Sequence, residues 1–295
     1  MLNKELIDTV QEADSLQFLK TLPDNCIDSI ITSPPYFGHR DYGNNGQIGL
    51  EVGMNEYICA IADVFDECRR VLKKTGTFWL NIGDTYVGAT SQHKNGGSQG
   101  KSSRYSKKHM NGIPGSGRAA RNKALYALGY PMKSMLGVPW RVAFELQARK
   151  WILRSDIIWH RPSTSESVQD RPTHAHEYVF MFAKSGKYYY DRQHMLTETG
   201  ANMHSVWRIG GTPFRGAHCA VFPPQLIEPI LLASCPPEGI VLDPFGGSGT
   251  VGMVARQHNR HFLLCDISRE NVKLAHERIF HGVSSSDKKR LAARK

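Results

Sequence analysis

A run of four residues, Ser33-Pro34-Pro35-Tyr36, directly follows the apolar run Ile27–Thr32 and combines groups that could bind a flat polar molecule. Two consecutive prolines cannot continue a central strand, so the chain must leave a sheet here. Because proline has no N–H, the nearby carbonyl oxygens have fewer local partners and can face a ligand. With the Ser33 hydroxyl as a further acceptor and Tyr36 as an aromatic face, the run suits a planar base that carries an amino group. A proline turn with a packed tyrosine is the simpler alternative.

A second motif, Gly239–Gly252, leads from an apolar run ending in Asp243 through a glycine-rich turn into an apolar helix. Glycine lets the backbone pass close to a ligand, and a helix N-terminus offers N–H groups to a carboxylate or phosphate. Asp266, at the end of the next apolar run, is a candidate acceptor for ribose hydroxyls. The G-x-G-x-x-G spacing over residues 247–252 also fits the dinucleotide fingerprint. This motif alone therefore leaves an NAD-dependent oxidoreductase and a purely structural turn open.

Both motifs need a frame that brings distant residues together, and the pattern of apolar residues indicates one. Runs typical of buried strands cover Ile27–Thr32, Thr77–Ile82, Trp151–Trp159, Glu177–Ala183, Gly239–Asp243 and His261–Asp266. Helical spacing covers Tyr57–Lys73, Val138–Ala148, Pro224–Ala233, Thr250–Gln257 and Ser268–Ile279. We expect Gly76 to cap the first of these helices. The alternation predicts an α/β fold with a mainly parallel sheet and helices on both faces. Ser33 and Asp243, 210 positions apart, should then border one cleft.

Most of the positive charge lies in one segment. The net charge is +10, and residues 86–138 hold nine Lys and Arg but no Asp or Glu. Glycine, serine and tyrosine are interleaved with the basic residues, which favours a segment that contacts DNA phosphates over a merely solvated loop. The basic run at 287–295 is typical of a solvated tail.

Other features limit the class of protein. No apolar run approaches the ~18 residues of a membrane helix, and the N-terminal residues lack an apolar signal core, so we expect a cytoplasmic protein. The six cysteines are scattered without a CxxC pair, which predicts reduced thiols and no metal site.

Taken together, the two motifs resemble those of the amino-methylating DNA methyltransferases of restriction-modification and phage systems. SPPY at 33–36 precedes DPFGGSGT at 243–250, an order similar to that of the β group, in which the catalytic motif comes before the cofactor motif. The resemblance covers roughly residues 13–282, with the basic segment outside it. Supporting stretches are TFWLNIGDTY (77–86), DRPTHAHEYVFMFAKSGKYYYD (170–191) and FPPQLIEPILLASCPPEGIVLDPF (222–245).

The resemblance implies a Rossmann-like, S-adenosylmethionine-dependent methyltransferase fold. Residues 1–85 and 139–282 would form its catalytic domain, 86–138 a DNA-binding insertion and 283–295 a basic tail. The implied catalytic residues are Ser33, Pro34, Pro35 and Tyr36. The implied contacts to S-adenosyl-L-methionine are Asp14, Asp243, Phe245, Gly247, Gly249, Thr250 and Asp266. Ala13 departs from the glycine that usually precedes the acid at 14. The basic segment adds Lys107, Lys108, Arg118, Arg121 and Lys133 as candidates for DNA binding.

In the resembled group, the first position of the catalytic motif is usually Ser in cytosine-N4 enzymes and Asp or Asn in adenine enzymes. Ser33 therefore favours N4 of cytosine in double-stranded DNA, with N6 of adenine as the alternative. If Ser33 Oγ and the Pro34 carbonyl accept the two hydrogens of the amine, its lone pair can attack the cofactor methyl directly. The base must first be flipped out of the duplex and can then stack on Tyr36.

Other interpretations and partners follow from the same motifs. The resemblance also implies a functional link to a cognate restriction endonuclease, whereas the oligomeric state stays open. An NAD-dependent oxidoreductase is a remote alternative because it leaves SPPY unexplained. A DNA-binding module with an inactive cofactor fold is disfavoured because both motifs are intact.

Overall fold

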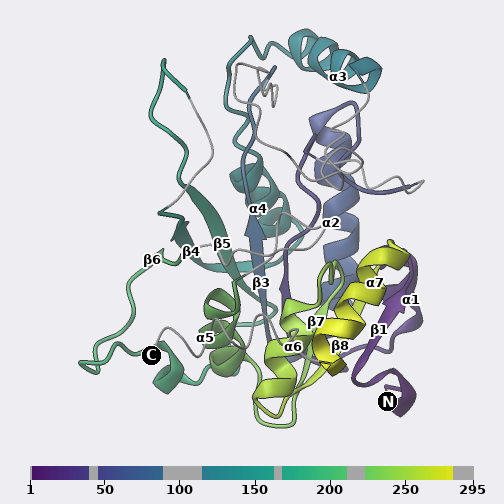
Figure 1. The fold of residues 1–295 in the computed structure, drawn as a ribbon, viewed down its shortest axis with the longest axis vertical. Helices are drawn as coiled ribbons and strands as arrows, with labels where there is room; N and C mark the ends of the chain where they lie inside the picture. The colour runs from purple at the N-terminus through teal and green to yellow at the C-terminus, as the bar shows by residue number, and fades with distance from the viewer. Residues whose placement is uncertain (1, 40–45, 89–114, 163–167, 211–222, 282–295) are drawn as a thin grey trace, which may run out of the picture.

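The computed structural model describes residues 2–39, 46–88, 115–162, 168–210 and 223–281 (Figure 1). Within these residues one sheet has eight strands, in the order β1-β8-β7-β2-β3-β5-β4-β6. Their bounds are β1 Thr9–Glu12, β2 Ile27–Thr32, β3 Leu72–Ile82, β4 Ile152–His160, β5 His176–Ala183, β6 Val206–Arg208, β7 Ile240–Asp243 and β8 His261–Asp266. All the neighbouring pairs are parallel except the two that β5 makes with β3 and β4. The sheet is thus mixed but mostly parallel, as expected.

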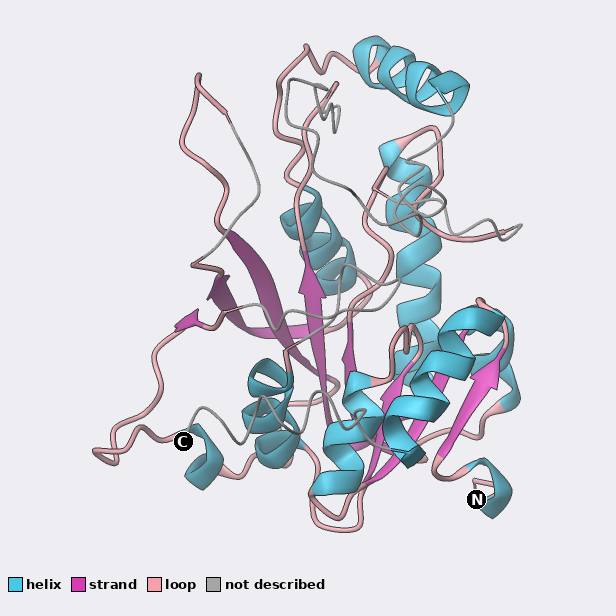
Figure 2. Cartoon of the chain, viewed as in Figure 1, coloured by secondary structure: helices cyan, strands magenta, loops and turns pink. Residues whose placement is uncertain are grey.

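Helices cover both faces of this sheet (Figure 2). The α-helices of the described residues are α1 Ser15–Thr21, α2 Met54–Val71, α3 Gly115–Ala127, α4 Val138–Ala148, α5 Pro224–Ser234, α6 Thr250–Gln257 and α7 Arg269–His276. Short 3-10 turns span Lys4–Leu6 and Arg192–Met195, and a π-helical turn, Glu277–His281, continues α7. No helix in this part of the chain is long and apolar enough to cross a membrane.

Two apolar cores lie on opposite faces of the sheet because side chains alternate along each strand. Ile30 and Phe78 belong to the core that α1, α2 and α4 cover. The next residues, Ile31 and Trp79, belong to the core that α5 and α6 cover. Central strands with both faces buried explain why these runs are almost continuously apolar in the sequence.

The predicted cap at Gly76 is wrong. Helix α2 ends at Val71, and Gly76 lies inside β3, which begins at Leu72. The register between β2 and β3 shifts at this point, and a Cβ at Gly76 would lie 2.7 Å from the Asp28 carbonyl oxygen. Glycine is therefore needed because the two backbones approach closely at a bulge.

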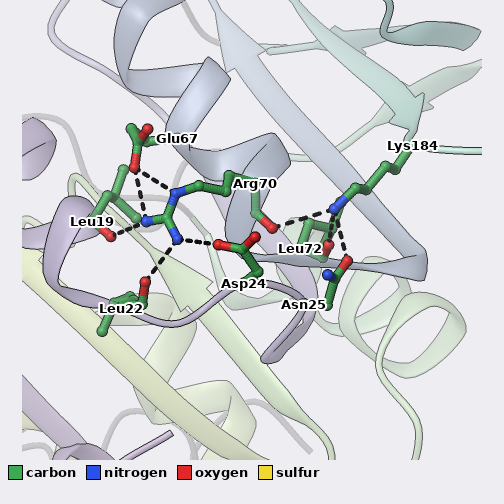
Figure 3. A network of polar contacts seen from close by, with 8 residues as sticks. All are labelled: Leu19, Leu22, Asp24, Asn25, Glu67, Arg70, Leu72 and Lys184. Carbon is green, nitrogen blue, oxygen red and sulfur yellow. Dashed lines mark hydrogen bonds and ion pairs between the residues drawn. The ribbon is translucent and has the colours of Figure 1, made fainter. Parts of the chain in front are cut away.

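Polar contacts fix the edge of the sheet where β2 and β3 begin (Figure 3). Arg70 of α2 donates to the carbonyls of Leu19 and Leu22 at the end of α1, at 2.7 and 2.8 Å. Lys184, just after β5, donates to the carbonyls of Arg70 and Leu72 at the end of α2, at 3.3 and 2.6 Å. The last carbonyls of both helices are thereby satisfied. This network anchors α1 and α2 at one edge and leaves the opposite edge for a binding site.

Candidate active site

The opposite edge collects the ends of strands from distant parts of the sequence. β2, β3, β7 and β8 run in parallel, so Thr32, Ile82, Asp243 and Asp266 end there together. β5 runs the other way, so its second residue, Glu177, lies at the same edge. In open α/β sheets this edge is where ligands bind.

The predicted catalytic residues leave β2 at this edge in a fixed conformation. The Pro35 carbonyl accepts a hydrogen bond of 2.9 Å from the Tyr57 hydroxyl of α2. Pro34 is buried, whereas Ser33 and Tyr36 are half-buried. A Cβ at Gly83, just after β3, would lie 2.7 Å from a ring carbon of Tyr36. The Tyr36 ring is thus in contact with the Gly83 backbone, which restricts its movement.

Two residues that the sequence analysis did not single out bind the catalytic run. Asn81 Oδ1 lies 3.2 Å from Ser33 Oγ and 2.9 Å from Tyr36 Oη. Glu177 Oε2 accepts from Tyr36 Oη at 2.6 Å. Burial, followed by the charge of Glu177, raises the pKa of Tyr36 well above its ordinary value, so its phenol stays protonated. A polar residue inside each of two apolar strands was the signal that could have revealed this network.

The glycine-rich motif begins at the neighbouring strand end. Asp243 is 2% exposed and accepts hydrogen bonds from the Phe245 N–H at 3.0 Å and from Thr32 Oγ1 at 2.5 Å. Thr32 precedes Ser33, so the contact joins the two motifs directly. The expectation that distant Ser33 and Asp243 come together at one edge is confirmed. Burial, the largest cause, raises the pKa of Asp243 to about 7.

Two further predicted acids lie at the adjacent strand ends. Asp266 accepts from the Gly247 N–H at 2.9 Å, from the Ser268 N–H at 2.8 Å and from Asn271 Nδ2 at 3.0 Å. Asp14 caps α1 and accepts from the Gln17 N–H at 2.9 Å. The Ala13 N–H donates to the Asp266 carbonyl at 3.1 Å, which brings the start of α1 to the same edge. Asp243 and Asp266 therefore contact the glycine-rich turn, and Asp14 lies at the start of α1 at the same edge, an arrangement suited to a ligand with positive charge and hydroxyl groups.

The turn itself is closely packed on one side and open on the other. Gly249 has a φ of +76°, and a Cβ there would lie 2.7 Å from the Ala275 Cβ of α7. At Gly247 a Cβ would meet, among the described residues, only the Phe245 carbonyl oxygen, 3.8 Å away. Thr250 then begins α6, whose N-terminus points its free N–H groups toward this turn. The residues present therefore fit a small ligand that approaches the backbone at Gly247.

The candidates for DNA binding are placed differently from one another. Lys133 has a side chain that is 79% exposed and pairs with Asp170 at 2.5 Å. Arg121 is 6% exposed and lies over the Phe37 ring at 5.4 Å, in the space that a side chain at Gly38 would fill. As placed, Arg121 supports the chain after Tyr36 and does not present its donors at the surface. Lys107 and Lys108, and the side chain of Arg118, lie outside the described residues.

Solved structures share this fold. The PvuII DNA methyltransferase (cytosine-N4-specific) matches with a TM-score of 0.67 at 20% identity, covering 97% of this chain and 91% of that one. A putative DNA modification methylase from Thermus thermophilus, complexed with S-adenosyl-L-methionine, matches with a TM-score of 0.62 at 19% identity, covering 94% and 96%. The expected methyltransferase fold is thereby confirmed.

Relatives found by their sequences share a larger fraction of identical residues with this chain than the solved structures do. The Type II methyltransferase M.Cfr9I of Citrobacter freundii is 41% identical over 279 residues, which are 92% of this chain and 87% of the relative. M.SmaI of Serratia marcescens, also named a Type II methyltransferase, is 40% identical over 273 residues, which are 90% and 88% of the two chains. A family model for DNA methylases, N6_N4_Mtase, matches residues 27–277, which include both motifs. The chain therefore belongs to the N6/N4 DNA methylase family.

Proposed function

We propose that the protein transfers the methyl group of S-adenosyl-L-methionine to N4 of a cytosine flipped out of double-stranded DNA. The observation that carries the choice of cytosine is Ser33 at the head of the catalytic run, where adenine enzymes of the resembled group usually have Asp or Asn. The cytosine-N4 specificity of the structurally similar PvuII methyltransferase supports the same choice. The Type II names of the sequence relatives support a link to a restriction endonuclease that cuts the same DNA sequence.

The cofactor would lie against the glycine-rich turn, which fits it by charge and by space. The bound cofactor supplies a methyl group on a positively charged sulfur. Asp243, Asp266 and Asp14 offer carboxylates to its charge and its hydroxyl groups, and the backbone at Gly247 is open for close approach. The direct contact of Asp243 with Thr32 supports a position for this ligand next to the catalytic run.

The chain's own residues would prepare the cytosine amine for attack. An exocyclic amine is a poor nucleophile because its lone pair is shared with the ring. Of the two proline carbonyls, that of Pro35 is occupied by Tyr57. We assign the Pro34 carbonyl and Ser33 Oγ as the acceptors of the two amine hydrogens, which frees the lone pair and positions it. The clamped Tyr36 ring would stack on the flipped base.

The test is to express the protein in a host without DNA methylation and to analyse the nucleosides of its DNA by mass spectrometry. The proposal predicts N4-methyldeoxycytidine, and no such product in cells that carry an inactive variant. N6-methyldeoxyadenosine in place of it would overturn the choice of cytosine and establish the second candidate, which the family also includes.

Cofactor affinity should depend on pH because the pKa of Asp243 is about 7. A positively charged ligand favours the ionised carboxylate, so affinity should fall about tenfold per pH unit below 7 and level off above it. Without ligand, the free energy of unfolding changes with pH in the opposite direction. Asp243 contributes stability below pH ~4, its unfolded pKa, and that contribution is lost as the pH rises through about 7. Calorimetry at pH 6, 7 and 8 measures the effect, and Asp243→Asn should flatten the profile. Equal affinity at pH 6 and 8 in the wild type would rule out this role.

We further propose that residues 86–138 form a DNA-binding insertion in a catalytic domain made of 1–85 and 139–282. The two ends of the insertion lie side by side, since Tyr86 pairs with Met135 and the Val87 N–H donates to the Ser134 carbonyl at 2.9 Å. Tyr86 and Val87 follow β3, which ends at the catalytic edge, so the insertion leaves the catalytic domain at this edge.

Replacing Lys107 and Lys108 by alanine should weaken binding to all DNA sequences alike. Each lost phosphate contact should reduce the slope of log affinity against log salt by about 1. The control replaces Lys20 and Lys187, which are exposed near the opposite edge of the sheet. A deletion of 90–112 is a stronger test than one that reaches Arg121 and Leu125, because both of these side chains are buried. Undiminished binding after this deletion would place DNA recognition elsewhere.

A further inference from the structure

The buried carboxylate of Glu177 has a partner on each of its oxygens. Oε2 accepts the Tyr36 hydroxyl at 2.6 Å, and Oε1 lies 2.8 Å from Arg161 Nη1. The Glu177 side chain is 10% exposed, whereas that of Arg161 is 37% exposed. A buried charge is costly unless it is paired and hydrogen-bonded, so a glutamate here needs both contacts. Because the carboxylate lies beside the catalytic run, it can influence the hydrogen bonds of Ser33.

The number of hydroxyl hydrogens and acceptors determines how these side chains pair. The Tyr36 hydroxyl has one hydrogen and two acceptors within reach, Glu177 Oε2 at 2.6 Å and Asn81 Oδ1 at 2.9 Å. The carboxylate is closer and forms the stronger, charge-assisted bond, so it accepts the hydrogen bond of the Tyr36 hydroxyl. Asn81 Oδ1 then accepts the hydrogen of Ser33 Oγ at 3.2 Å, which is closer to Ser33 than its other acceptor, Tyr36 Oη, at 3.4 Å.

The orientation of Asn81 is set independently. Its Nδ2 donates to the Tyr178 carbonyl of β5 at 3.0 Å, so its oxygen must face Ser33 and Tyr36. With its only hydrogen directed to Asn81, the Ser33 hydroxyl turns its lone pairs to the other side. Ser33 is thus an acceptor for an incoming donor such as an amine. Without the carboxylate, Tyr36 would donate to Asn81 Oδ1, which would then accept from both hydroxyls and bind the Ser33 hydrogen less strongly.

We propose that Glu177, held by Arg161, is a positioning residue for methyl transfer. It accepts the hydrogen bond of the Tyr36 hydroxyl, so that Asn81 accepts the hydrogen bond of Ser33. Ser33 is then free to accept a hydrogen bond from the target amine. The inference rests on the proposed role of Ser33. Glu177 itself touches neither the base nor the cofactor in this arrangement.

Glu177→Gln is the sharpest variant because it keeps the shape of the side chain. The Arg161 guanidinium donates, so the carboxamide oxygen should face it and the NH₂ group should face Tyr36. Tyr36 then has no acceptor at residue 177 and donates to Asn81. The single-turnover methylation rate should fall roughly 10–100-fold, as expected when a hydrogen bond to a charged group is lost. The affinities for cofactor and DNA should stay unchanged.

A second substitution separates positioning from packing. Phenylalanine at 36 has no hydroxyl hydrogen to compete for Asn81, so Glu177→Gln/Tyr36→Phe should methylate faster than Glu177→Gln alone. A merely structural glutamate predicts the opposite, with losses that add. The matched control is Asp28→Asn, which removes a half-buried carboxylate paired with Lys73 at 2.7 Å, at the other end of β2. It should leave the rate unchanged.

The outcomes are distinct. Unchanged turnover in Glu177→Gln, or a double variant slower than the single one, overturns the positioning role. If the single variant does not fold, the rate of the double variant against that of Tyr36→Phe decides, because the proposal predicts that these two are similar. The nucleoside product of the wild type reports on the proposed function alone, so failure there is recognised separately.

Discussion

Replacing Ser33 with alanine is expected to lower the methylation turnover by about 10²–10³-fold, the usual loss when one group that binds the reacting atoms in the transition state is removed. Alanine leaves the amine with one acceptor, the Pro34 carbonyl, and the lone pair is no longer positioned. Cofactor affinity should not change, since Ser33 is assigned to the amine. Single-turnover kinetics and calorimetry measure the two quantities separately.

Ser29→Ala is the control for this variant. Ser29 is a buried serine inside β2, the strand that precedes Ser33, and shares a hydrogen bond of 2.7 Å with Ser234, away from the catalytic edge. It should lower stability without a selective loss of turnover. Full turnover in Ser33→Ala would make that serine structural, and the choice of cytosine over adenine would lose its main support.

Gly249→Ala is expected to lower the free energy of unfolding by about 2–5 kcal/mol. A left-handed φ of +76° costs an alanine roughly 1–2 kcal/mol. The new Cβ would also lie 2.7 Å from the Ala275 Cβ and 2.9 Å from its Cα, and overpacking of this kind costs about 1–3 kcal/mol. α7 must shift to make room, which disturbs the glycine-rich turn. Urea unfolding measures the stability, and cofactor affinity should fall as well.

Two glycines separate these contributions. Gly200 has a φ of +79°, and a Cβ there would meet nothing within 4 Å among the described residues, so Gly200→Ala reports backbone strain alone. Gly252 has no left-handed φ, but a Cβ there would lie 2.8 Å from Ile279 Cδ1, so Gly252→Ala reports packing without left-handed strain, together with a gain in helix propensity of about 1 kcal/mol. If Gly249→Ala costs no more than Gly200→Ala, then contact with α7 does not constrain the turn.

Long apolar runs made most of the sheet predictable. The predicted strands that end in Thr32, Ile82, Asp243 and Asp266 are confirmed at those ends. Each is buried on both faces, so its apolar character does not depend on neighbours that the sequence cannot show. The short strands β1 and β6 were not predicted, because four or three partly exposed residues carry too little periodicity.

The site was predictable only where its residues form a local motif. Ser33, Asp243 and Asp266 stand in recognisable motifs, and the structure brings them to one edge. Asn81 and Glu177 have no motif of their own, and their importance comes from the register of β3 with β5, which pairs Asn81 with Val179 and Ile82 with Tyr178. Register depends on contacts across about a hundred positions of sequence, which neither strand encodes alone.

The order of strands in the sheet also has a consequence for synthesis of the chain. β2 pairs with β7, and β1 pairs with β8, so the first two strands need partners that the ribosome makes much later. At about 5–20 residues per second, roughly 10–40 seconds separate translation of Thr32 from that of Asp243. Until then the Thr32 hydroxyl lacks the carboxylate that joins the two motifs. A chain that ends before Asp243 therefore carries the whole SPPY run without the carboxylate that joins it to the glycine-rich motif, so the site can form only after Asp243 is made.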